Sequence, residues 1–456
     1  MRNFFFLLIC IVTACGTGTG ENSGQDSLAG TTPEIVITTG SVTTLSCKLN
    51  VANSYEIYLP QSHSDSSLYP VLVFFSPDGK GKTPVEKYRT LADKWNFILV
   101  GSDYTKNGMD ANAALAGANE LVTDVKNRFN VDGARVYLSG FSGGARVAGG
   151  LALSRMDITG VICCSASPPA SVSPRGYVGI AGLGDMNYLE MKKFRASTQA
   201  DAGLNELLVF DGKHEWPPVG TMENAMLMIS LFQPGQAASG DMNQMSDSLT
   251  SNILAECDSL KRISCMLEFQ LLESGIHAEK NYSGVAAFEE RRKKLEGSSC
   301  VKNEEKHWAE IESQESDLQK VLSESVLSHD TTWWRANSDS YFETKKTGAE
   351  KFMRQRLRGY VSLLCYTYCN QAFSMKNMHA AEKLVKVYSI VDPTNSEWAY
   401  LQARLYMGLN MTDFAISSMD TAVSLGFNDR QRVERDPTFA PVLSNPAFTV
   451  VLAKMN

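Results

Sequence analysis

The residues best suited to do chemistry lie in one short stretch, where a serine is bracketed by glycines. Ser142 has Gly140 two positions before it and Gly144 two positions after it. An apolar run precedes the glycines and a run of small residues follows them, so a strand should turn sharply into a helix at the serine. Glycines on both sides remove the Cβ atoms that would clash in such a turn. The spacing therefore predicts an exposed Ser142 hydroxyl that acts as a nucleophile.

The same turn predicts where negative charge on a substrate oxygen would be stabilised. The backbone N–H of Gly143 opens the new helix, whose N-terminus carries a partial positive charge. A second donor of this oxyanion hole is expected from the loop after a neighbouring apolar strand, residues 76–81. Pro77 has no N–H, so Ser76 or Asp78 is expected to donate, with a plain turn role as the alternative for Asp78.

A serine nucleophile needs a base, and one histidine is placed to supply it. Between Ser142 and residue 234 the only histidine is His214. It follows a predicted strand in a short loop, from which an imidazole can reach over the serine. Trp216, two positions further on, is a candidate for lining the substrate pocket, with packing of the loop against the body as the alternative.

The base in turn needs an acid that orients it, and Asp185 is the best placed. It stands directly after an apolar strand and a Gly-Leu-Gly segment, at the carboxyl end of that strand. In the expected chain order the acid falls between the serine and the histidine. The other acidic residues in this interval are expected in helices, within or before strands, or in a turn. These are Asp157, Glu190, Asp201, Glu206 and Asp211.

The elements that must position these residues follow an alternating pattern. Short β-branched runs predict strands over 54–59, 71–75, 97–102, 135–138, 160–164, 177–181 and 206–210. Helical spacing predicts helices over 85–95, 112–129, 143–155, 188–198 and 221–231. Near-continuous apolar strands that alternate with helices indicate an α/β fold with a mostly parallel sheet covered on both faces. Such sheets bind ligands beyond the carboxyl ends of their strands, which is where Ser142 and Asp185 fall.

Residues 35–234 therefore resemble an α/β-hydrolase, and are most similar to secreted polyhydroxybutyrate depolymerases, feruloyl esterases and dienelactone hydrolases. The resemblance rests on the segments 58–60, 140–144, 184–185 and 214–217. It implies Ser142 as nucleophile, Asp185 as orienting acid and His214 as base, in an acyl-enzyme mechanism without a cofactor. The chain departs from many members of the family after the strand over 71–75, where it has Ser-Pro-Asp-Gly in place of His-Gly.

The N-terminus reads as a targeting segment. Arg2, an apolar run and the small residues before Cys15 resemble a bacterial lipoprotein signal over 1–14, with Cys15 as the lipidation site. An ordinary secretory signal is the alternative. Residues 15–34, rich in Gly, Ser and Thr, are expected to form a flexible tether. The residue after the cysteine, Gly16, favours the outer membrane of a bacterial cell envelope, with the lipid as the only membrane contact.

Composition and cysteine spacing exclude some functions. The chain has 456 residues, so two domains are expected. Its net charge is −7, so nucleic-acid binding is not expected. The sequence has no paired CxxC motif, and its six histidines form no cluster, so no metal site is expected. Cys163 and Cys164 lie in an apolar run and are expected in the core, while export permits disulfides among the remaining cysteines.

The second half of the chain predicts helices only. Residues 235–247 are small and polar and predict a linker, and residues 248–456 have helical periodicity. Near the end, small or apolar residues recur at a period of 34, a spacing that resembles tetratricopeptide repeats. The pairs are Cys369 with Ala403, Ala381 with Ala415, Val385 with Met419, and Tyr388 with Ala422. The resemblance implies an all-α repeat domain that could bind a protein partner.

Two functions of different classes fit these patterns. The first is a membrane-anchored serine esterase that acts outside the cytoplasm on an acylated small molecule or polysaccharide. The second is a hydrolase fold that has lost its activity and carries a protein- or glycan-binding helical domain. Retention of a serine, an acid and a histidine in the expected order favours the esterase. A serine peptidase is a lesser alternative.

Overall fold

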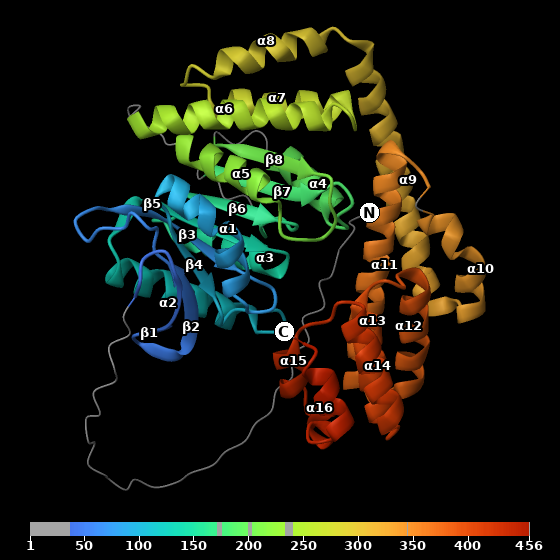
Figure 1. Cartoon of the computed structure of the whole chain (residues 1–456). Helices are drawn as coiled ribbons and strands as arrows, with labels where there is room; N and C mark the ends of the chain where they lie inside the picture. The colour runs from blue at the N-terminus through green and yellow to red at the C-terminus, as the bar shows by residue number, and fades with distance from the viewer. Residues whose placement is uncertain (1–36, 171–175, 199–202, 233–239, 344, 456) are drawn as a thin grey trace, which may run out of the picture. The chain divides into compact units, whose positions relative to one another are not determined.

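The computed structural model describes residues 37–170, 176–198, 203–232, 240–343 and 345–455 (Figure 1). The predicted lipoprotein signal, the lipid site Cys15 and the tether lie outside the described residues. In the part of the chain that is described, no helix is both long and apolar enough to cross a membrane.

One eight-stranded sheet organises the first half of the chain. Its strands stand in the order β1-β2-β4-β3-β5-β6-β7-β8, with β1 and β2 antiparallel to their neighbours and the rest parallel. The seven predicted strands are all present, and β1 is an additional one at the edge. The bounds are β1 Val42–Cys47, β2 Asn50–Tyr58, β3 Tyr69–Phe75, β4 Ile98–Ser102, β5 Val131–Phe141, β6 Gly160–Cys164, β7 Gly176–Gly182 and β8 Asn205–Phe210.

Helices cover both faces of this sheet, because its inner strands are apolar on both sides. In β3, Leu72 and Phe74 join the core under α1 and α5, whereas Val71 and Val73 join the core under α2 and α3. The predicted core residues Cys163 and Cys164 are fully buried in β6. The five predicted helices are α1 Lys82–Trp95, α2 Ala111–Arg128, α3 Gly143–Ser154, α4 Tyr188–Thr198 and α5 Val219–Leu231.

The fold class predicted from the sequence, a mostly parallel α/β sheet followed by a helical region, is confirmed. The helical region contains α6 Gly240–Leu260, α7 Cys265–Ala278, α8 Val285–Glu296, α9 Ser299–Ser328, α10 Thr331–Phe342, α11 Gly348–Ser374, α12 Met378–Val391, α13 Ser396–Gly408, α14 Thr412–Ser424, α15 Arg430–Arg435 and α16 Pro446–Leu452, with a short 3₁₀ helix at Pro437–Val442. A disulfide between Cys265 and Cys300 joins α7 to α9.

The positions that recur at a period of 34 lie where helices pack. All eight are buried, and they fall on α11, α12, α13 and α14, which contact one another in sequence order. Small residues at such positions let neighbouring helices approach closely, so the periodicity correctly located the helix contacts. Membership of the tetratricopeptide family stays a prediction.

The helical region does not begin as the sequence suggested. Of the linker predicted over 235–247, residues 235–239 lie outside the described residues and the rest belong to α6. From Ile37 onward the chain forms one compact unit, and α6 packs on α5 (Figure 1). The reason is that every residue of α5 from Thr221 to Leu231 is buried, so the helix needs cover on the side away from the sheet.

This contact between α5 and α6 contains a carboxyl group that should make stability depend on pH. Burial raises the pKa of Glu256 to about 7, although its Oε2 accepts a hydrogen bond of 2.8 Å from Asn224 Nδ2. Because the folded state binds this proton more tightly than the unfolded state, the free energy of unfolding should fall as pH rises from about 4.5 to about 7. Glu256→Gln should therefore be near neutral at pH 5 and stabilise by about 1–3 kcal/mol at pH 8. Urea unfolding at both pH values measures this, and equal effects at the two would contradict it.

Candidate active site

The turn between β5 and α3 carries Ser142 in a strained conformation. Its φ is 53° and its ψ −119°, a combination that costs a residue with a side chain about 1–3 kcal/mol. The turn is held by a hydrogen bond of 2.8 Å from Ser142 N to Cys164 O, at the end of the neighbouring strand β6. Ser142 is therefore fixed at the carboxyl edge of the sheet, as its spacing predicted.

Two glycines make this turn possible, because they lie too close to neighbouring backbone to carry a Cβ atom. A Cβ atom at Gly140 would lie 2.2 Å from Gly144 O, and one at Gly144 would lie 1.9 Å from Phe75 O. Real Cβ atoms do not come so near to backbone, so any other residue would force α3 away from β3 and β5. The glycines thus bring the first turn of α3 onto the ends of these strands.

Ser142, His214 and Asp185 form one chain of hydrogen bonds. His214 Nε2 lies 3.0 Å from Ser142 Oγ, and His214 Nδ1 lies 2.9 Å from Asp185 Oδ1. A carboxylate can only accept, so Nδ1 carries the proton and Nε2 is left to accept from the serine hydroxyl. The structure therefore brings together the three residues that the sequence analysis selected, in the tautomer that base catalysis needs.

Asp185 is rigidly held beyond the end of β7. It is fully buried, and its Oδ1 also accepts a hydrogen bond of 2.8 Å from Asn187 N. Asn187 Nδ2 donates to Ser165 O at 2.8 Å, which ties the loop to the end of β6. These contacts orient the carboxylate toward the imidazole. The His214 side chain itself remains 24% exposed.

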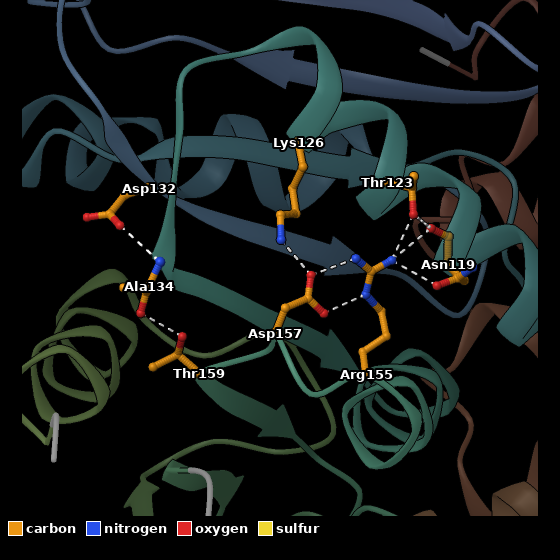
Figure 2. A network of polar contacts seen from close by, with 8 residues as sticks. All are labelled: Asn119, Thr123, Lys126, Asp132, Ala134, Arg155, Asp157 and Thr159. Carbon is orange, nitrogen blue, oxygen red and sulfur yellow. Dashed lines mark hydrogen bonds and ion pairs between the residues drawn. The ribbon is translucent and has the colours of Figure 1, made fainter.

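The rejected acid Asp157 serves a different purpose (Figure 2). It precedes β6, at the edge of the sheet opposite to Ser142, and binds Lys126 at 2.6 Å and Arg155 at 2.7 Å. The hydrogen bond from Arg155 is the main cause that holds the pKa of Asp157 well below its usual value. Arg155 also donates to Asn119 and Thr123 on α2. Asp157 therefore joins α2 to the turn after α3.

Three other rejected acids have partners other than His214. Glu190 on α4 binds Arg146, and Glu206 in β8 binds Arg195. Asp211 forms an ion pair of 3.5 Å with Lys351. Asp201 lies outside the described residues.

Both candidate second donors of the oxyanion hole lie in the loop after β3. A Cβ atom at Gly144 would lie 3.1 Å from Ser76 N, so this N–H is close to the start of α3. Asp78 Oδ1 accepts from Ser76 Oγ and, at 3.3 Å, from Lys80 N, which is the turn role considered above. The geometry thus places Ser76 N beside the serine turn and gives the Asp78 side chain contacts within its own loop.

This loop is anchored by a neighbouring loop that the sequence analysis did not single out. Gly81 N donates to Asp103 Oδ1 at 2.8 Å, and Asn107 N donates to Pro77 O at 2.8 Å. Burial raises the pKa of Asp103 to about 6, and the hydrogen bond from Gly81 opposes this shift. Asp103, which anchors the loop, therefore loses its proton and becomes negatively charged as the pH rises through about 6.

Asn107 and Phe141 are site residues that the sequence reasoning missed. A Cβ atom at Gly143 would lie 1.9 Å from Asn107 Oδ1, so this amide lies against the backbone that is expected to bind the oxyanion. The Phe141 ring lies 4.8 Å from the imidazole of His214. Phe141 could have been found from its place in the serine pentapeptide. Asn107 carries no such signal.

Trp216 packs against the body of the protein. Its ring lies 5.3 Å from that of Phe141, 6.0 Å from that of Phe74 and 6.2 Å from that of Tyr88. Tyr88 also donates from its hydroxyl to Pro217 O at 2.8 Å. These contacts fix the loop that carries His214, as the packing alternative described. A role of Trp216 in the substrate pocket stays a prediction.

Three residues of metal-ligating type meet at one place among the described residues, namely Cys265, Cys300 and Glu304. The two cysteines form the disulfide, and Glu304 accepts from Ser264 Oγ and from Met266 N at the start of α7. The two sulfur atoms and the Glu304 carboxylate are thus already engaged in contacts that hold α7 to α9.

The strand order, the serine turn and the chain order of serine, acid and histidine define an α/β-hydrolase fold. No protein-family model matches the chain, and no curated protein does.

Among solved structures, the chain is similar to an esterase from the archaeon Pyrobaculum calidifontis, with 13% identity and a TM-score of 0.36 over 43% of this chain and 86% of that one. It is similar to a feruloyl esterase module from Clostridium thermocellum, with 13% identity and a TM-score of 0.32 over 39% and 82%. An S-formylglutathione hydrolase from Staphylococcus aureus has 14% identity and a TM-score of 0.32 over 40% and 93%.

Proposed function

We propose that the protein is a serine hydrolase that cleaves carboxylic esters. The observation that carries this proposal is the hydrogen-bonded chain of Ser142, His214 and Asp185, with distances of 3.0 and 2.9 Å. A strained serine at the N-terminus of a helix, hydrogen-bonded to a histidine that a buried carboxylate orients, is the arrangement that activates a hydroxyl as a nucleophile.

The reaction follows from these positions. Ser142 Oγ attacks the ester carbonyl carbon while its proton passes to His214 Nε2. Asp185 stabilises the imidazolium that forms. The carbonyl oxygen becomes negative and is bound by the N–H groups of Gly143 and, in our proposal, Ser76. The intermediate then expels the alcohol, which takes the proton from His214, and leaves an acyl group on Ser142. Water then attacks the acyl group while His214 takes its proton, and Ser142 leaves with that proton as the acid is released.

The substrate class is proposed from the sequence. The lipoprotein-like signal and Cys15 would hold the enzyme on a bacterial envelope membrane, where acylated molecules, including acylated polysaccharides, are the esters within reach. Amide substrates are the less favoured choice, and the helical region would contact a partner or the substrate.

The test is covalent labelling of the chain that starts after Cys15. We expect a fluorophosphonate to label wild type at Ser142, located by peptide mass spectrometry, and p-nitrophenyl acetate to be hydrolysed. Ser142→Ala should lose the label and reduce turnover by at least about 10³-fold, while its unfolding curve stays close to that of wild type. A folded wild-type protein that neither labels nor turns over would falsify the proposal and favour a binding role for the helical region.

A further inference from the structure

Helix α11 of the helical region contacts the loop that carries Asp185 through the side chain of Arg356. Arg356 Nη1 donates a hydrogen bond of 2.7 Å to Leu183 O, across 173 residues of sequence. Leu183 is two residues before Asp185, and its N–H donates to Phe210 O at the end of β8. The guanidinium of Arg356 is thus attached to the backbone that sets the position of the catalytic acid.

Arg356 is itself held with little freedom. It is fully buried, and its Nε and Nη2 bind both carboxylate oxygens of Glu315 on α9, which is also fully buried. Its guanidinium lies 4.9 Å from the ring of Tyr188, which follows the Asp185 loop. A two-point contact between a guanidinium and a carboxylate fixes the orientation of both groups, so the donor to Leu183 points in one direction.

Two further residues on the same side of α11 contact the loop. A Cβ atom at Gly184 would lie 2.4 Å from Gln355 Oε1, and one at Gly359 would lie 3.5 Å from the Met186 side chain. Gln355 and Gly359 are four residues apart and therefore share one helix face. Residues on both sides of Asp185 thus contact α11.

The Asp185 loop also meets the segment that carries the base. Gly184 N donates to Gly212 O at 2.9 Å, two residues before His214. The Asp185 loop therefore contacts both the His214 loop and α11. A displacement of the loop would change the contact between Asp185 and His214, and shifts of about 1 Å can cost 10²-fold in rate.

We infer that Arg356 is a positioning residue, which holds Asp185 in hydrogen-bond contact with His214 and makes catalysis depend on the helical region. The inference rests on the proposed function, since Arg356 acts only through the acid and the base. It assigns the helical region a part in the hydrolase site, beside any part in binding a partner.

A second contact joins the helical region to the other side of the site. Lys80, in the loop that carries Ser76, lies 3.0 Å from Asp429, which precedes α15. Both side chains are partly exposed, and ion pairs of this kind contribute little. Because the hydrogen bond from Arg356 to Leu183 O is buried and Glu315 fixes the guanidinium that donates it, the dependence of the site on the helical region should run through Arg356.

The test compares two double variants that each remove an ion pair with α9. In Glu315→Gln with Arg356→Met, both charges disappear and the volume is kept, a replacement that buried ion pairs often tolerate, but Leu183 O loses its donor. The control is Lys192→Met with Glu312→Gln, which removes a pair of 2.7 Å between α4 and the same helix. Arg356→Lys, which keeps the charge beside Glu315, serves as a second variant should the first not fold.

We expect kcat for p-nitrophenyl acetate to fall about 10- to 100-fold in the Arg356 variants, with KM within about threefold, and to stay within about twofold in the control. The low-field proton resonance of the His214 Nδ1–H, assigned with His214→Ala, should shift or vanish in the Arg356 variants only.

A folded Arg356 variant with wild-type kcat and an unchanged resonance overturns the inference and leaves the proposed function standing. If wild type has no turnover, the proposed function fails, and the resonance alone then decides whether α11 orients Asp185 against His214.

Discussion

Asp185→Asn is expected to lower kcat for an activated ester by about 10⁴-fold without unfolding the protein. Asparagine keeps the shape of the buried side chain, but it can turn its NH₂ toward His214 Nδ1. Because one oxygen, Oδ1, accepts from both His214 Nδ1 and Asn187 N, that orientation also removes the acceptor for Asn187 N. The imidazole then carries its proton on Nε2, where it cannot accept the proton of Ser142. The measurement is kcat with p-nitrophenyl acetate, beside urea unfolding of both proteins.

The matched control for this prediction is Asp211→Asn. Asp211 lies three residues before His214, in the same loop, and its ion pair with Lys351 is exposed. Exposed pairs contribute about 0–1 kcal/mol, so this variant should keep kcat within about twofold. An Asp185→Asn protein that folds and keeps kcat within tenfold of wild type would show that another group orients the base.

The triad could be predicted because the fold leaves few choices. Ser142 stands out by its glycines, and His214 by being alone in its interval. Asp185 follows from the rule that the acid lies at the carboxyl end of a strand. These are constraints on local sequence and chain order, which is why Ser142, His214 and Asp185 meet as expected.

The residues around the triad could not be predicted in the same way. Asn107 reaches Gly143 from a loop with no motif, and Arg356 reaches Leu183 from a helix 173 residues away. Such contacts depend on how helices pack on the sheet, which neither hydrophobic periodicity nor spacing encodes. Strand β1 was missed for a simpler reason, since only Leu45 and Cys47 of its six residues are buried.

The start of the helical region did carry a signal that composition obscured. The segment after residue 234 is small and polar, which favoured a linker. Met242, Met245, Leu249 and Ile253 nevertheless recur at helical spacing and are all buried. Together with an α5 that is buried on every side, they form a contact that makes the sheet and the first helices of the helical region one compact unit.

This shared core leads to the second large effect that we expect, which is that a chain of residues 37–232 does not fold. Asn224, Leu227, Met228 and Leu231 are spaced to share one side of α5, and Asn224 binds Glu256 of α6. Without α6 that side meets water. Exposing three large apolar side chains costs about 5–9 kcal/mol, which is comparable to the whole stability of a typical domain.

The short chain should therefore aggregate, or lack near-ultraviolet circular dichroism and a cooperative urea transition, whereas residues 37–456 show both. Co-expression of residues 240–456 as a separate chain should restore solubility and ester hydrolysis, because α6 covers α5 without a covalent bond and Arg356 returns to Leu183. If the short chain alone unfolds cooperatively and hydrolyses the ester at the full rate, neither the shared core nor the positioning by α11 is needed. Rescue of both properties by the separate chain would instead show that the helical region completes the fold and the site together.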